Sequence, residues 1–282
     1  MAREKKASEM IPYLEERINC ANIIGYIDRK RISENVDRKS TKLIINNIDV
    51  LLDVVTYGRD LESDKEEPNE EFTEELVEDE LVAEDIDPDI GGGASPTGFF
   101  TIYDFMTESN YNGFEYFPYI YGILNCSDQP EPVVYTFYEF FENNLVEIIS
   151  NMEHASEWYD IVFQMAMINY YIQIANNYNY EGGIVANHLC HRLPKPYYKQ
   201  YELSSASIKV SHRCLIVLWN VTKLEKTDNP SKTSNIWYLL NYVETNKDNL
   251  KIKPSERIMK LLVELHDGPS RTLEILEKYY RQ

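Results

Sequence analysis

The sequence predicts an all-α fold, an irregular multi-helix bundle with a long acidic disordered insertion. Three observations lead to this prediction. Apolar residues recur at helical spacing through most of the chain, no segment alternates apolar and polar residues convincingly, and proline and glycine separate the periodic segments. With 282 residues, 43% of them hydrophobic, the chain is long enough for one large domain or two small ones.

Residues 12–29 and 40–57 are predicted to form a helical hairpin. Further helices are predicted at 101–107, 113–124, 134–152, 157–177, 184–192, 205–224, 235–246, 255–267 and 270–281. The segment 157–177 is apolar on most sides, which is typical of a central helix. Successive helix pairs with short connectors resemble the HEAT and armadillo type of α-solenoid. Since no fixed-period repeat is present, an irregular bundle fits the pattern equally well.

The predicted organisation has three parts: an N-terminal helical hairpin at 1–59 that packs on the main body, an acidic flexible linker at 60–98, and a main helical domain at 99–282. Residues 60–90 hold 16 acids and one lysine. Such a segment repels itself and buries little apolar area, so disorder is expected. Apolar residues interleaved among the acids make it a candidate partner-binding segment as well; a solvated linker is the alternative.

Charge is unevenly distributed along the chain. Between Lys65 and Arg192 there are 25 acidic residues and no lysine or arginine, in a chain of net charge −19. This balance argues against general coating of nucleic acids and against docking on anionic membranes. A basic protein partner is easier to reconcile with it.

The favoured function is therefore non-enzymatic: a helical scaffold, adaptor or chaperone-like module that binds a basic protein or nucleic-acid-processing machinery. Carboxylates would pair with lysine and arginine, and aromatic rings would anchor the contact. Residues 99–180 carry 22 of the 35 aromatic residues. The candidate partner-binding residues are Phe72, Leu76, Leu81, Tyr103, Asp104, Glu115, Tyr116, Tyr119, Tyr121, Glu139 and Glu142.

Two alternatives remain open. A viral or parasite regulator could use the acidic region to imitate nucleic acid and occupy the cationic groove of a nucleic-acid enzyme. A metal-dependent or thiol enzyme would need a cluster of ligands or nucleophiles, and the candidates are His188, Cys190, His191, His212 and Cys214. Imidazole and thiolate suit Zn²⁺, but the spacing departs from the usual ligand pairs. The prediction is therefore no cofactor, with zinc as the alternative, and buried helix-contact residues as the plainer interpretation.

The C-terminal third, residues 192–282, has a net charge of +6. A nucleic-acid patch with Tyr197 and Tyr198 for stacking is conceivable, but a solvated surface that complements the acidic region is favoured at this modest charge. Direct nucleic-acid binding is thus not predicted.

The sequence predicts an intracellular protein, cytoplasmic or nuclear, and not a secreted one. The N-terminal residues MAREKKASEM lack an apolar signal region. The apolar stretch Ile161–Ala175 is shorter than the roughly 20 residues of a membrane span. The cysteines at 20, 126, 190 and 214 are widely scattered, so reduced thiols are predicted.

Overall fold

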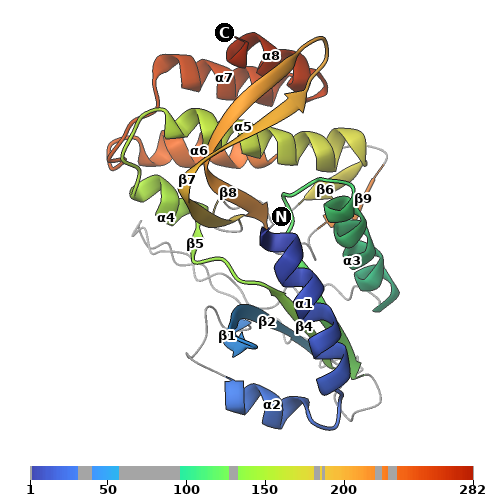
Figure 1. The fold of residues 1–282 in the computed structure, drawn as a ribbon. Coiled ribbons are helices and arrows are strands. Elements are labelled where there is room, and N and C mark those ends of the chain that lie inside the picture. Colours follow the sequence, from blue (N-terminus) through green and yellow to red (C-terminus); the bar gives the residue numbers. More distant parts are fainter. Residues whose placement is uncertain are drawn as a thin grey trace, which may run out of the picture.

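The computed structural model describes residues 2–30, 40–56, 96–126, 133–180, 185, 188–219, 224–227 and 234–281 (Figure 1). An antiparallel sheet covered by the N-terminal helices forms one part of the molecule. A larger part is built around a buried helix, and Figure 1 shows it above the sheet. The predicted acidic linker 60–98 lies outside the described residues except for its last three, which begin a helix.

The first sheet has, in the described part of the chain, the strand order β1-β2-β4-β3. Its strands are β1 (Ser40–Ile45), β2 (Ile48–Thr56), β3 (Ile120–Cys126) and β4 (Val133–Glu139). Asn46 and Asn47 join β1 to β2 with φ of 51° and 60°. Two consecutive positive φ values are what a tight two-residue hairpin turn requires, and asparagine tolerates them. Since β2 pairs with β4, the sheet joins segments from both sides of residue 59.

These strands overturn the all-α prediction, and with it the bundle and solenoid interpretations. The ranges 40–57, 113–124 and 134–152, predicted as helices, contain the four strands. Every residue of β4 is buried, so the strand is apolar on both faces and shows no alternation of apolar and polar residues. Its valines and aromatic residues favour an extended chain once a neighbouring strand is available.

Helices α1 (Ala2–Arg17) and α2 (Ile23–Lys30) cover this sheet, and the core beneath them includes Met10 and Leu14. Cys20, in the turn between these helices, forms a disulfide with Cys126 at the end of β3, across a sequence separation of 106. The prediction of four reduced thiols is therefore wrong for this pair. The sequence could not reveal the pairing, because only the packing of α1 on the sheet brings the two cysteines together.

The larger part contains most of the helices. These are α3 (Pro96–Tyr111), α4 (Leu145–Ser150), α5 (Glu157–Asn169), the π-helix η1 (Tyr170–Ala175), α6 (Asn235–Asn246), α7 (Glu256–Asp267), the 3₁₀-helix η4 (Pro269–Arg271) and α8 (Thr272–Tyr280). Helix α5 is almost entirely buried, as predicted for a central helix, and η1 continues it. The predicted helices 157–177, 235–246, 255–267 and 270–281 are confirmed. None of the described helices combines the length and hydrophobicity of a membrane span.

Strands complete the larger part: β5 (Asn143–Asn144), β6 (Tyr178–Tyr180), β7 (His188–Glu202), β8 (Ser207–Leu218) and β9 (Leu224–Lys226). Strands β5, β7 and β8 form one sheet, and β6 pairs with β9. The outer portion of the β7–β8 hairpin, residues 192–213, is called the ribbon below. In Figure 1 it crosses α5 and reaches α8. The helices predicted at 184–192 and 205–224 are wrong, since β7 and β8 occupy these ranges.

Candidate functional site

A buried polar network joins α5 to β8. Asp160 Oδ1 accepts a 2.6 Å hydrogen bond from His212 Nδ1, and Asp160 Oδ2 accepts one of 2.6 Å from the backbone N–H of Arg213. Gln164, one turn further along α5, donates to Cys214 O at 2.8 Å and accepts from Ile216 N at 2.9 Å. The side chains of Asp160 and Gln164 thus take the place of a neighbouring strand along the edge of β8. They supply hydrogen-bond partners to backbone groups of β8 that would otherwise be buried without any.

The network continues from His212 towards the sheet. With Nδ1 as donor, a neutral imidazole offers Nε2 as acceptor, and Tyr201 OH lies 2.7 Å from it. Tyr201 OH is in turn 2.7 Å from Tyr116 OH. Burial raises the pKa of both tyrosine hydroxyls, so they remain neutral hydrogen-bonding groups near pH 7.

Hydrogen bonds link Asp160 through His212 to Tyr201. The linked groups are a carboxylate, an imidazole and a hydroxyl, which is the order that nucleophilic enzymes use. All three side chains are buried, however, and the terminal hydroxyl contacts Tyr116. A substrate could reach this hydroxyl only if the strands separated from α5. The geometry therefore supports a structural role: the network fixes the position of β7 and β8 on the buried helix.

The five candidate zinc ligands do not converge. The part of the chain that the structure describes holds no group of three or more His, Cys, Asp or Glu residues suited to a metal ion. His212 is held in the Asp160 network, and His191 lies opposite Leu215 in the strand register. Burial raises the pKa of the Cys190 and Cys214 thiols, which disfavours the thiolate that a metal or a nucleophile needs.

Most of the predicted partner-binding tyrosines lie inside the protein. Tyr103, Tyr116 and Tyr121 are buried, and Tyr103 OH is 2.8 Å from Tyr138 OH. Tyr119 is half-buried beneath the Arg3 guanidinium, which is 4.9 Å from the ring centroid. Their rings serve the core of the protein and are not available to a partner in this arrangement.

Two of the predicted partner-binding acids are paired within the chain. Arg3, on α1, donates to both carboxylate oxygens of Glu139, with a shortest distance of 2.7 Å. Lys199, on the ribbon, lies 3.5 Å from Glu115. Both cations come from outside the lysine- and arginine-free run, so the folding of the chain partly neutralises the run.

Asp104 and Glu142 are exposed, and Asp104 lies on α3. Glu108 and Tyr111 follow Asp104 at spacings of four and seven, which places all three on one side of the helix. These three residues are called the α3 face. Sequence reasoning missed Glu108 and Tyr111 because it ended the helix at residue 107. The remaining candidates, Phe72, Leu76 and Leu81, lie outside the described residues.

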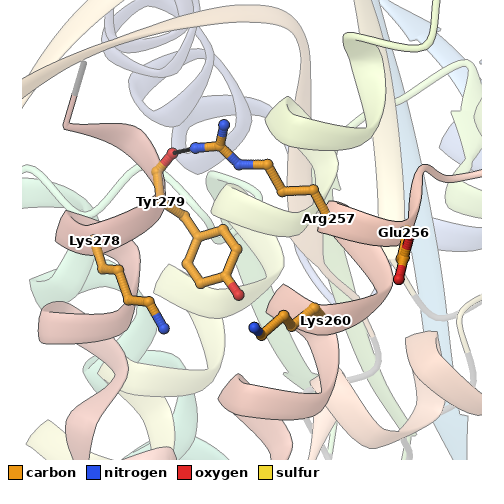
Figure 2. Close-up of a pocket in the computed structure, with 5 residues that line it drawn as sticks. All are labelled: Glu256, Arg257, Lys260, Lys278 and Tyr279. Carbon is orange, nitrogen blue, oxygen red and sulfur yellow. Dashed lines mark hydrogen bonds between the residues drawn. The ribbon is translucent and has the colours of Figure 1, made fainter.

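A shallow pocket of about 420 Å³ lies between α7 and α8, and Figure 2 shows the side chains that line it. Its lining residues are Glu256, Arg257, Lys260, Lys278 and Tyr279. Lys278 Nζ donates to Glu264 at 2.7 Å, and Tyr279 OH donates to the same carboxylate at 3.0 Å. The carboxylates of Glu256 and Glu264 thus offset most of the positive charge of the lining arginine and lysines. The pocket therefore exerts little attraction on an anion.

No protein-family profile matches the sequence. A protein of Acanthamoeba polyphaga mimivirus, named "Uncharacterized protein R691", is 37% identical over 289 aligned positions, which cover 99% of each chain. The chain belongs to the family of this mimivirus protein. The match spans both chains almost completely. A viral member agrees with the viral origin that one of the functional alternatives assumed.

Proposed function

We propose that this protein is a non-enzymatic binding protein that engages a basic protein partner through the α3 face. The observation that carries the proposal is the exposure of that face. Asp104 and Glu108 are both exposed, and neither forms an ion pair with any residue the structure describes. Tyr111 is 77% exposed, which is unusual for a large aromatic side chain.

Among the described residues, other acids of the lysine- and arginine-free run are paired with cations of the chain, unlike those of α3. Glu115, Glu139 and Glu157 each have a cationic partner within the chain. The carboxylates of the α3 face keep their charge for an external partner. Residues 66–90, which precede α3 in the sequence, add 13 acids and no lysine or arginine. The sequence on the N-terminal side of α3 thus carries further negative charge that favours a basic partner.

The chemistry of this face matches a surface rich in lysine and arginine. Carboxylates accelerate the encounter with such a surface and exclude acidic partners. An arginine or lysine of the partner can stack on the exposed ring of Tyr111, which adds cation–π attraction. Tyrosine also supplies a large contact area at a small cost in side-chain entropy.

The non-enzymatic part of the proposal is supported by a comparison with protein kinases, whose order of helices and strands is similar but whose reactive residues differ. The order strand, helix, strand, strand (β2, α3, β3, β4) resembles the frame of protein kinases, and so does the helical part with paired strands that follows it. In kinases, a lysine on the strand before the helix pairs with a glutamate of that helix, and aspartates in two later loops bind metal and the substrate hydroxyl. This likeness concerns the frame alone and carries no activity by itself.

The positions that would hold these reactive groups carry other residues. Strand β2 reads IDVLLDVVT and has no lysine or arginine. Residues 181–187, between β6 and β7, read EGGIVAN and lack aspartate. Residues 219–221, directly after β8, read Trp-Asn-Val where kinases have Asp-Phe-Gly. At these positions the sequence does not carry the charged groups that kinases use for phosphoryl transfer, which supports the non-enzymatic proposal.

Binding of the full-length protein to purified core histones, as a basic probe, tests the proposal by fluorescence anisotropy. The double variant Asp104→Lys/Glu108→Lys should weaken binding by about tenfold, since each reversed charge replaces an attraction by a repulsion. Tyr111→Ala should weaken it further. Rising salt should weaken wild-type binding steeply, because these charges are exposed.

The matched control is Glu244→Lys/Glu274→Lys, which makes the same change of charge at two exposed positions on α6 and α8. It should leave binding within about twofold if the α3 face is the interface. An equal loss in both double variants would refute the α3 face, and absence of histone binding at low salt would refute the basic partner. Competition by duplex DNA for the same histone surface would favour the alternative of nucleic-acid imitation.

A further inference from the structure

The ribbon differs in charge from the rest of the protein. Residues 192–213 contain five lysine and arginine residues and one acid, a local net charge of +4 in a chain of −19. Arg192 and Lys199 are paired with Glu157 and Glu115. Lys195, Lys209 and Arg213 are exposed. None of these three forms an ion pair with any of the described residues, so their charge is available to a ligand.

Two aromatic rings accompany these cations. Tyr197 is 49% exposed and Tyr198 is 59% exposed, although buried tyrosines are abundant elsewhere in this protein. Tyr198 faces Ser211 in the strand register, on the side of the ribbon directed away from the core. Lys209 Nζ lies 5.0 Å from the centre of the Tyr198 ring. The pair presents a flat ring beside a cation, and this combination suits a nucleotide base and its phosphate.

An irregularity in the strand pairing exposes the third cation. Arg192 pairs with Cys214 and Tyr197 with His212, so four residues of β7 stand opposite one residue of β8. Lys195 lies in this bulge between Pro194 and Pro196, which restrict the backbone. Bulges re-aim side chains and are frequent beside functional sites. Tyr197, which follows the bulge, pairs with His212, and their rings lie 6.4 Å apart. Tyr197 therefore lies on the side of the ribbon directed toward α5, whereas Tyr198 lies on the outer side.

The ribbon is fixed before any ligand binds. Its inner side is held by Tyr201, whose ring packs 4.7 Å from that of Phe163 on α5. At its tip, the Glu277 carboxylate on α8 accepts hydrogen bonds from Ser204 Oγ at 2.8 Å and Ser205 N at 2.9 Å. A preorganised surface loses little conformational entropy on binding.

We propose that the outer face of the ribbon, defined by Tyr198, Lys209 and Arg213, binds single-stranded nucleic acid. A base would stack on the Tyr198 ring and phosphates would contact Lys209 and Arg213, without selection of sequence. Two acids close to the ribbon, Glu115 and Glu157, are paired with its own Lys199 and Arg192, and charges more than about 10 Å away are screened at 0.1 M salt. The net charge of the whole chain argued against nucleic-acid binding. That value, however, sums acidic and basic residues that lie in different parts of the protein.

The test uses the full-length protein and fluorescein-labelled oligo-dT and oligo-U of about 15 nucleotides, with anisotropy measured at several salt concentrations. Tyr198→Ala should weaken binding by about tenfold, the loss of one stacked base, whereas Tyr198→Phe should bind like wild type. Lys209→Ala/Arg213→Ala should weaken binding and lower the slope of log K against log salt by about 1.4, for two phosphate contacts.

Matched controls use exposed residues of the same types elsewhere. Lys247→Ala/Lys251→Ala, between α6 and α7, and Tyr111→Ala on α3 should not change oligonucleotide affinity. Because Tyr111→Ala is expected to reduce histone binding only, the two surfaces are distinguished. Absence of oligonucleotide binding at 50 mM salt, equal affinity for polyglutamate, or insensitivity to Tyr198→Ala would overturn the proposal.

Discussion

Removal of the Arg3 side chain tests how the N-terminal helix is attached to the rest of the protein. The guanidinium donates to the Glu139 carboxylate, and it also donates to the carbonyl oxygens of Glu115 at 2.7 Å and Phe117 at 2.8 Å. The side chains of Arg3 and Glu139 are only 19% and 10% exposed. Arg3→Ala would leave the carboxylate with the backbone N–H of Tyr119 as its remaining hydrogen-bond donor among the described residues.

The expected cost is about 3 kcal/mol of unfolding free energy, the lower end of the range for breaking a buried ion pair. The lower end applies because both groups keep some contact with water. Urea unfolding at pH 7, followed by far-UV circular dichroism, measures the change. Lys5→Ala is the matched control on the same helix: Lys5 is exposed and lies 3.9 Å from Glu9, so its loss should cost less than about 0.5 kcal/mol.

A double-mutant cycle with Glu139→Ala isolates the pair itself. We expect a coupling energy of at least about 1.5 kcal/mol, since the two side chains share three hydrogen bonds. A loss below about 1 kcal/mol for Arg3→Ala would refute the reasoning. It would show that Glu139 is in effect solvated, and would return this residue to the candidates for partner binding.

Two further predictions concern the disulfide and the tip of the ribbon. Cys20→Ser or Cys126→Ser should lower the unfolding free energy by about 2–4 kcal/mol without reductant, and a wild type indifferent to reductant would argue against the bond. Hydrogen bonds from Ser205 and Ser204 lower the pKa of Glu277 to about 2, from 4.5. Its contribution to stability is therefore present above about pH 4.5 and lost as pH falls towards 2. Glu277→Gln should remove this acid sensitivity and Glu274→Gln should not, as measured by unfolding at several pH values.

The sequence was most informative where the residues of one segment decide its structure. Helices α6 and α7 were predictable because their apolar residues repeat at helical spacing, and Ser234 and Ser255 cap them as their positions suggest. Strand β8 also carried a usable signal, since its first residues alternate between exposed and buried. Reading this segment as a helix gave too much weight to its leucines and too little to that alternation.

The candidate site was harder to predict. Asp160 and Gln164 lie four residues apart in an otherwise apolar helix, and buried polar groups of this kind require partners. That spacing could have indicated a buried network, but not its members on β8 and β7. Tyr197 and Tyr198 were named from the sequence, yet no local pattern predicts the strand pairing that turns one ring toward α5 and the other outward.

The sequence by itself determined the charge segregation, the buried character of α5 and the C-terminal helices, because these follow from composition and local periodicity. Only the tertiary structure decided which acids are paired with a cation of the same chain and which can pair with an external partner. Arg3 is 136 positions from Glu139, and Lys199 is 84 positions from Glu115; their pairing depends on how sheet, helix and ribbon pack. Electrostatic attraction acts through space within about 10 Å, and distance along the chain does not report distance in space.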